Sequence, residues 1–233
     1  RRSADPGAAE FLAPGATLGH IVARYRMWTG PWLEFATDKL AGQRTVKQAD
    51  EGTGQLLLVT NGSGWYDYFA DLEFTERFRL EGEALFWTLH FRNVTHKPVE
   101  IAELLLPLPF DAGESGGAPG RLVRKSVIRG RGSYVVFAPA SGKGPRLVLL
   151  PVDKCPLFEP AQTERNYAPV SVRAEDGRGI FLMGGPGAAP GSGHTLTPKF
   201  TPGDELTYGF KLRWAEDESR VAAVLKDEGI VLE

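Results

Sequence analysis

Two consecutive segments, Leu72–Leu80 and Ala84–Asn93, alternate between apolar and polar residues with a period of two. On one face, the first segment places Leu72, Phe74, Glu76, Phe78 and Leu80, and the second places Leu85, Trp87, Leu89 and Phe91. Alternation of this kind sets one face of a strand on a core and leaves the other face wetter. Because only Glu81-Gly82-Glu83 separates them, the segments are predicted to form an antiparallel hairpin.

Further strand-like segments, each bounded by Gly, Pro, Asp or Asn, run along the chain. They are Leu18–Met27, Trp32–Thr37, Gln55–Thr60, Val99–Leu106, Leu122–Arg129, Ser133–Ala138, Arg146–Val152, Val170–Ala174, Ile180–Met183 and Glu205–Trp214. The 28 Gly and 17 Pro are spread along the sequence, which indicates many turns. Parallel strands would need crossover helices, so short links favour antiparallel pairing. The predicted fold class is all-β, a large antiparallel β-sandwich over residues 1–215.

One helix is predicted, in the last segment of the chain, residues 216–233. Asp217 can cap it, and Gly229 with Ile230 behind it suits its C-terminal end. Its apolar face holds Val221, Val224 and Leu225. A lone helix after a β-domain either docks on that domain or leads into another. We predict a short C-terminal helix that links to a further domain.

Bulk properties argue against several function classes. The net charge of −2 gives no basic face for nucleic acid. The single Cys155 excludes an intramolecular disulfide and leaves little sulfur for a metal site. No apolar run approaches the roughly 20 residues of a membrane helix. We therefore expect no nucleic-acid partner and no membrane span.

Motifs for cofactors, metals and activated nucleophiles are absent from the sequence. It has no Gly-x-Ser-x-Gly elbow, no phosphate-binding P-loop and no His-Glu-x-x-His zinc motif. The histidines, His20, His90, His96 and His194, do not have the spacing of metal ligands and are interpreted as structural. We expect no cofactor and no metal.

Aromatic and acidic residues gather in two short stretches. The first holds Trp28, Trp32 and Glu34, and the second holds Trp65, Tyr66, Asp67, Tyr68 and Asp71. Sugar rings stack their C–H faces on Trp or Tyr, and their hydroxyls suit carboxylates. These residues are predicted carbohydrate contacts, with core filling or an interface to another domain as the alternative. Trp87 and Trp214, inside alternating strands, are assigned to that alternative, filling the core or facing another domain.

Catalysis by this chain alone stays open. Glycoside hydrolysis needs two carboxylates about 5 to 10 Å apart, and Glu34, Asp67, Asp71 and Glu73 are candidates. An epimerase needs a carboxylate base and a histidine acid, which His90 with Glu34 or Glu73 could supply. No independent feature supports either reaction.

Five stretches together resemble one bacterial family of uncharacterised function. They are Trp32–Lys39, Asp71–Asn93, Glu103–Phe110, Ile128–Phe137 and Arg213–Glu233. In that family a galactose-mutarotase-like β-supersandwich precedes an (α/α) toroid related to glycoside hydrolases. The resemblance implies a supersandwich fold, a carbohydrate partner, a neighbouring helical domain and a secreted or periplasmic location. Since the chain begins without Met, we expect a processed or truncated piece of a longer parent.

The most distinctive matching segment is Gly130-Arg131-Gly132-Ser133-Tyr134. The family pattern has histidine between the glycines, so Arg131 argues against an acid/base role there and favours binding an anionic or hydroxyl-rich group. In such proteins the toroid supplies the catalytic carboxylates and the sandwich shapes the cleft. The leading hypothesis is a carbohydrate-associated sandwich module of a glycoside-hydrolase-like protein, which binds a glycan or shapes the site for one. The alternatives are a stand-alone sugar-processing enzyme (epimerase, lyase or hydrolase) and a structural or oligomerisation domain.

Overall fold

A computed structural model describes residues 11–12, 21–27, 30, 33–36, 44–50, 54–61, 72–108, 110, 122–127, 133–152, 179–183 and 199–230. The elements are β1 (Val22–Met27), β2 (Leu33–Ala36), β3 (Arg44–Asp50), β4 (Gln55–Asn61), β5 (Leu72–Glu81), β6 (Ala84–Asn93), β7 (Val99–Pro107), β8 (Leu122–Val127), β9 (Tyr134–Pro139), β10 (Arg146–Val152), β11 (Gly179–Met183), β12 (Lys199–Phe200), β13 (Glu205–Ala215) and α1 (Glu218–Asp227).

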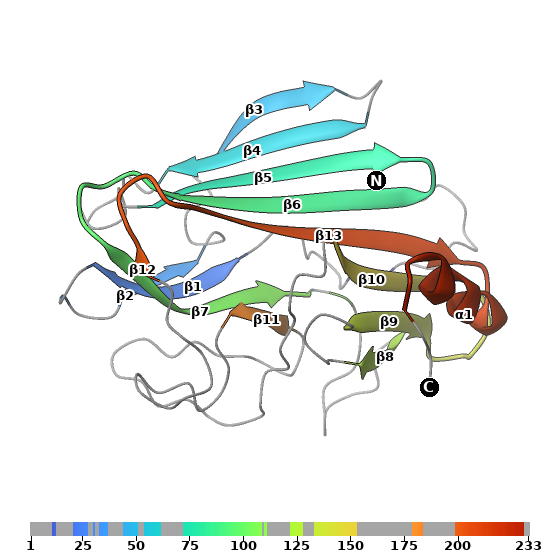
Figure 1. The fold of residues 1–233 in the computed structure, drawn as a ribbon. Coiled ribbons are helices and arrows are strands. Elements are labelled where there is room, and N and C mark those ends of the chain that lie inside the picture. The colour runs from blue at the N-terminus through green and yellow to red at the C-terminus, as the bar shows by residue number, and fades with distance from the viewer. Residues whose placement is uncertain are drawn as a thin grey trace.

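The strands form two sheets that lie one above the other (Figure 1). The large sheet has the order β3-β4-β5-β6-β13-β10-β9-β8, and the small sheet has the order β11-β7-β1-β2, with β12 also paired to β7. All described pairings are antiparallel. The prediction of an all-β antiparallel sandwich with a short C-terminal helix is confirmed.

The predicted hairpin of β5 and β6 is present, and its link is two residues long instead of the three expected, because Glu81 belongs to β5. Glu81 pairs with Ala84 across a two-residue link, in which Gly82 adopts a φ of 56°. Phe74 pairs with Phe91, and both are buried. Leu80 is on the same side of its strand but lies at the hairpin end of the sheet and is 55% exposed. The alternation thus predicts the buried face correctly, except at its last residue.

An apolar core fills the space between the two sheets. Trp87 of β6 is fully buried, with the Phe78 ring stacked at 5.4 Å and the Phe210 ring at 5.8 Å. Tyr25 reaches the same core from β1 of the small sheet. The assignment of Trp87 to the core is confirmed. Burial of rings of this size is a large part of what holds two such sheets together.

A second apolar cluster lies on the opposite face of the large sheet, under α1. Val221, Val224 and Leu225 of the helix pack there against Val136 of β9 and Val148 and Leu150 of β10. The helix begins at Asp217, whose carboxylate accepts a hydrogen bond from the Arg220 amide at 3.1 Å. These are the cap and the apolar face predicted from the sequence. Figure 1 shows α1 beside β10, near the C-terminal end of β13.

The C-terminal end of α1 is a Schellman motif. The amide of Gly229, with a φ of 74°, donates to the Lys226 carbonyl, and the amide of Ile230 donates to the Leu225 carbonyl. The end predicted at Gly229 and Ile230 is therefore confirmed. The link to a further domain stays a prediction.

Two strands were not predicted, namely the seven-residue β3 and the two-residue β12. The predicted strand Val170–Ala174 lies outside the described residues. Within the described part of the chain, no helix is both long and apolar enough to cross a membrane.

Candidate functional site

Most of the predicted carbohydrate contacts lie outside the described residues. These are Trp28, Trp32, Trp65, Tyr66, Asp67, Tyr68, Asp71 and Arg131. Glu34 lies on β2, where its backbone is opposite Arg24 of β1, and Arg24 is in turn opposite Glu103 of β7. The two predicted stretches thus stay predictions, with Glu34 alone located in the fold.

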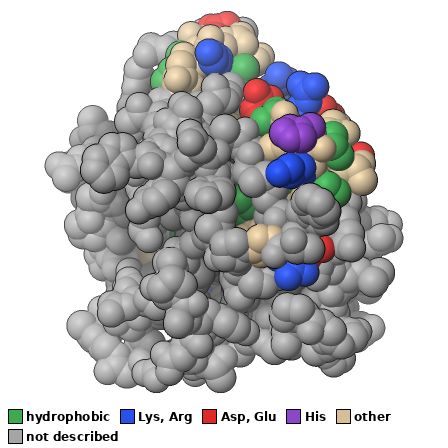
Figure 2. All heavy atoms as spheres, turned by 90° about the vertical axis from the view of Figure 1, so that its left-hand side faces the viewer, with side chains coloured by type: hydrophobic (Ala, Val, Ile, Leu, Met, Phe, Trp, Pro, Cys, Tyr) green, Lys and Arg blue, Asp and Glu red, His purple; other side chains and the backbone are tan. Residues whose placement is uncertain are grey.

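His90 contacts Glu205 at the end of the large sheet that lies opposite the β5–β6 hairpin. Its Nε2 lies 3.2 Å from Oε2 of Glu205, and Nε of Arg92 lies 3.7 Å from the other oxygen of that carboxylate. Glu73, considered above as a partner of His90, is opposite Arg92. Figure 2 views this end and shows basic, acidic and histidine side chains interleaved. Among the described residues, no group of three or more His, Cys, Asp or Glu could hold a metal.

A hollow of about 320 Å³ opens beside the β5–β6 hairpin. We call it the Trp214 hollow, and it is lined by Leu80, Gly82, Glu83, Pro145, Trp214, Ala215 and Glu216. Trp214 is 47% exposed, so it does not fill the core, and an interface to another domain stays a prediction for this residue. The hollow combines a large aromatic surface and an exposed leucine with two carboxylates.

The position of Trp214 follows from where the strands end. Phe210 and Leu212 of β13 point into the core, and Trp214 is on the same side. The last residue of β13 paired to β6 is Arg213, opposite Ala84. Trp214 therefore lies one residue beyond the last β6 partner, at the margin of the paired part of the sheet. Its ring instead packs edge to face with Phe11, with centroids 5.0 Å apart.

The two carboxylates of the Trp214 hollow, Glu83 and Glu216, are exposed. Among the residues that the structure describes, neither has an ion-pair or hydrogen-bond partner. Nearby acids differ, since Glu81 lies 2.9 Å from Nε of Arg79 and Glu218 lies 3.0 Å from Nζ of Lys125. The hollow thus has a negative charge that the neighbouring described residues do not neutralise.

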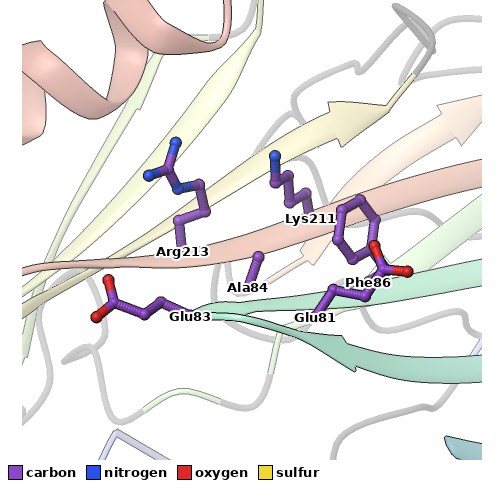
Figure 3. A pocket seen from close by; sticks show the side chains of 6 residues that line it. All are labelled: Glu81, Glu83, Ala84, Phe86, Lys211 and Arg213. Carbon is purple, nitrogen blue, oxygen red and sulfur yellow. The ribbon is translucent and has the colours of Figure 1, made fainter.

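A second hollow, of about 410 Å³, lies on the face of the large sheet that carries α1. We call it the Lys211 hollow, and it is lined by Glu81, Glu83, Ala84, Phe86, Lys211 and Arg213. Figure 3 shows the side chains of Lys211 and Arg213 rising from β13 on the same side. The Phe86 ring has Nζ of Lys211 at 5.2 Å and the Arg79 guanidinium at 5.4 Å from its centroid. Glu83 lines both hollows.

Both cations of the Lys211 hollow are bound to the end of α1. Nζ of Lys211 lies 2.6 Å and Nη1 of Arg213 lies 2.9 Å from Oε1 of Glu228. Burial raises the pKa of the Glu228 carboxyl, but the hydrogen bonds from Lys211 and Arg213 outweigh it, so that this pKa lies below its ordinary value. These side chains fasten the helix to the sheet.

The Trp214 hollow was not predicted from the sequence because its residues come from three separate segments of the chain. Glu83 is in a hairpin link, Pro145 precedes β10, and Trp214 is the second-last residue of β13. One local signal indicated that Trp214 lies near a strand end. It is followed by Ala215-Glu216-Asp217, where the strand pattern stops and an acidic helix cap begins.

No family model and no curated protein sequence matches the chain. Among solved structures, a polysaccharide lyase is similar, with a TM-score of 0.53 and 11% identity over 91% of this chain and 28% of that one. A candidate aldose 1-epimerase from Escherichia coli has a TM-score of 0.44 and 12% identity, over 83% of this chain and 79% of its own. A candidate kojibiose phosphorylase from the human microbiome has a TM-score of 0.44 and 13% identity, over 94% of this chain and 27% of its own. The similarity to the lyase shows a shared fold, and the chain spans 28% of the length of that protein.

Proposed function

We propose that this chain is a carbohydrate-associated β-sandwich module that contacts a glycan through the Trp214 hollow. The observation that carries the proposal is the half-exposed ring of Trp214 beside the carboxylates of Glu83 and Glu216. An exposed indole offers a flat apolar surface for the C–H face of a sugar ring. Two carboxylates without partners among the described residues offer acceptors for sugar hydroxyls.

The fold is compatible with a module of a longer protein. The polysaccharide lyase shares this fold over only 28% of its own length. We propose that the sandwich is of the galactose-mutarotase-like supersandwich type and that chemistry is carried out by a neighbouring helical domain. Trp28, Trp32, Glu34 and the stretch from Trp65 to Asp71, with Arg131, remain proposed additional contacts.

Isothermal titration of the full chain with oligosaccharides selected on a glycan array tests the proposal. Trp214→Ala is expected to weaken binding by about tenfold or more, because the stacking surface is removed, and Trp214→Phe is expected to retain part of the affinity. Val94→Ala is the control, since Val94 is also 47% exposed but lies beyond the opposite end of β6. Thermal unfolding of each variant verifies that it is folded.

Two results would count against the proposal. One is that no glycan on the array binds. The other is that Trp214→Ala binds as tightly as Val94→Ala, whereas Trp28→Ala or Trp65→Ala abolishes binding. The second result would move the contact surface to the stretches predicted from the sequence.

A further inference from the structure

We infer that the Trp214 hollow prefers saccharides carrying an ammonium group to neutral saccharides, and disfavours uronates. This inference rests on the proposed function and adds a substrate class to it. Among the described residues that line the hollow, Glu83 and Glu216 are charged and the others are uncharged. A ligand that enters the hollow therefore meets negative charge on the side chains around it.

Four basic side chains on the described strands around the hollow are already engaged. Lys211 and Arg213 bind Glu228, and Arg79 binds Glu81. Arg146, which precedes Leu147 at the start of β10, has a guanidinium that donates to the carbonyls of Gly142 and Gly144 and lies beside Glu218. A uronate carboxylate in the hollow would thus meet no cation among the described lining residues, and could gain one of these four only by displacing an existing contact.

An ammonium group gains from both parts of the hollow. It can approach the exposed carboxylates, and it can lie over the Trp214 ring, which attracts cations through its quadrupole. Leu80 and Pro145 supply apolar surface for the sugar ring itself. Exposed ion contacts each change affinity by up to about fivefold, so two carboxylates predict roughly tenfold between a cationic and an anionic sugar.

The test uses three β-1,4-linked hexasaccharides of equal length, made of glucosamine, glucose or glucuronate. Dissociation constants are measured by isothermal titration with the full chain at about pH 6, where the sugar amines are protonated. The expected order of affinity is glucosamine, then glucose, then glucuronate, with about tenfold between the first and the last at low salt. Raising the salt to about 0.5 M should compress this order, because exposed charges are screened.

A double variant, Glu83→Gln with Glu216→Gln, tests whether the preference comes from the two carboxylates. It should bring the three affinities to within about twofold while leaving the glucose oligomer nearly unchanged, since glutamine keeps size and polarity. Glu81→Gln is the matched control, because Glu81 lines the Lys211 hollow and is paired with Arg79. The control should leave the order intact.

The possible failures are distinguishable. If none of the three oligomers binds, the proposed function fails for β-1,4-linked hexasaccharides, and the inference fails with it. If they bind equally, or glucuronate binds most tightly, the inference is wrong although the module still binds glycans. If the order survives in the double variant, the preference does not come from Glu83 and Glu216, and the inference is wrong.

Discussion

Gly54 and Gly82 both adopt left-handed backbone angles, with φ of 64° and 56°, but their surroundings differ. A Cβ added at Gly54 would lie 2.9 Å from Cβ of Leu80, whereas a Cβ at Gly82 would meet nothing within 4 Å. Gly82→Ala should therefore lower the free energy of unfolding by about 1 kcal/mol, which is the cost of the backbone strain alone. Gly54→Ala should cost about 2 to 3 kcal/mol, since the clash adds to that strain. Urea unfolding of the two variants measures the difference, and equal losses would show that the contact with Leu80 relaxes freely.

Trp87 and Trp214 show what alternation in a sequence can predict for a single residue. Both occupy inward positions of alternating strands, and alternation correctly gives the side of the sheet for each. Burial also requires other side chains packed around the residue on that face, and their presence depends on where the strands end. Trp87 lies in the middle of β6 and is buried, whereas Trp214 passes the last β6 partner and is exposed. Since strand ends meet through long-range pairing, the candidate site was not predictable from the local pattern.

The elements with strong local signals are those that the sequence predicted. Helix α1 has a capping Asp217, an apolar stripe and a terminal Gly229, each readable over a few residues. β3 has the sequence RTVKQAD, and its residues 45–49 are exposed, so it has no buried face to give it an apolar period. β12 has only two residues. Their pairing with β4 and β7 is what defines these strands, and pairing is not visible in either segment alone.

The attachment of α1 to β13 through Glu228 should make stability depend on pH. Because Lys211 and Arg213 hold the Glu228 pKa below its ordinary value of 4.5, the ionised carboxylate stabilises the folded chain. That contribution is complete above the unfolded pKa, and it is lost as the pH falls through the lowered folded value. Glu228→Gln should thus reduce the free energy of unfolding by about 1 kcal/mol at neutral pH, and by less near pH 3.

Urea unfolding at both pH values measures the effect of Glu228→Gln. Glu81→Gln is the control, because the pair of Glu81 with Arg79 is about half exposed and should contribute less than about 0.5 kcal/mol. If Glu228→Gln lowers the free energy of unfolding equally at the two pH values, the charge on Glu228 does not hold the helix on the sheet.

At the scale of the whole molecule, the large sheet is covered unevenly. β10 has both faces buried, with Leu147 and Leu149 in the core between the sheets and Val148 and Leu150 under α1. It also has β13 on one side and β9 on the other. At one edge, β3 pairs with β4 alone among the described strands and has a register shift between Val46 and Gln48. A bulge with Lys47 at an exposed edge discourages pairing with another chain.

This uneven coverage predicts a gradient of hydrogen exchange across the large sheet. Amides of β10 should exchange only when the sandwich opens globally, because its backbone is paired on both sides and covered on both faces. Amides of β3 should exchange at least about a hundredfold faster, through local fraying of an edge strand with little buried surface. Exchange followed by mass spectrometry on peptides that span Arg44–Asp50 and Arg146–Val152 compares the two strands directly. Slow exchange in β3 that becomes fast on dilution would mean that a second copy covers the edge. Slow exchange at every concentration would contradict the gradient.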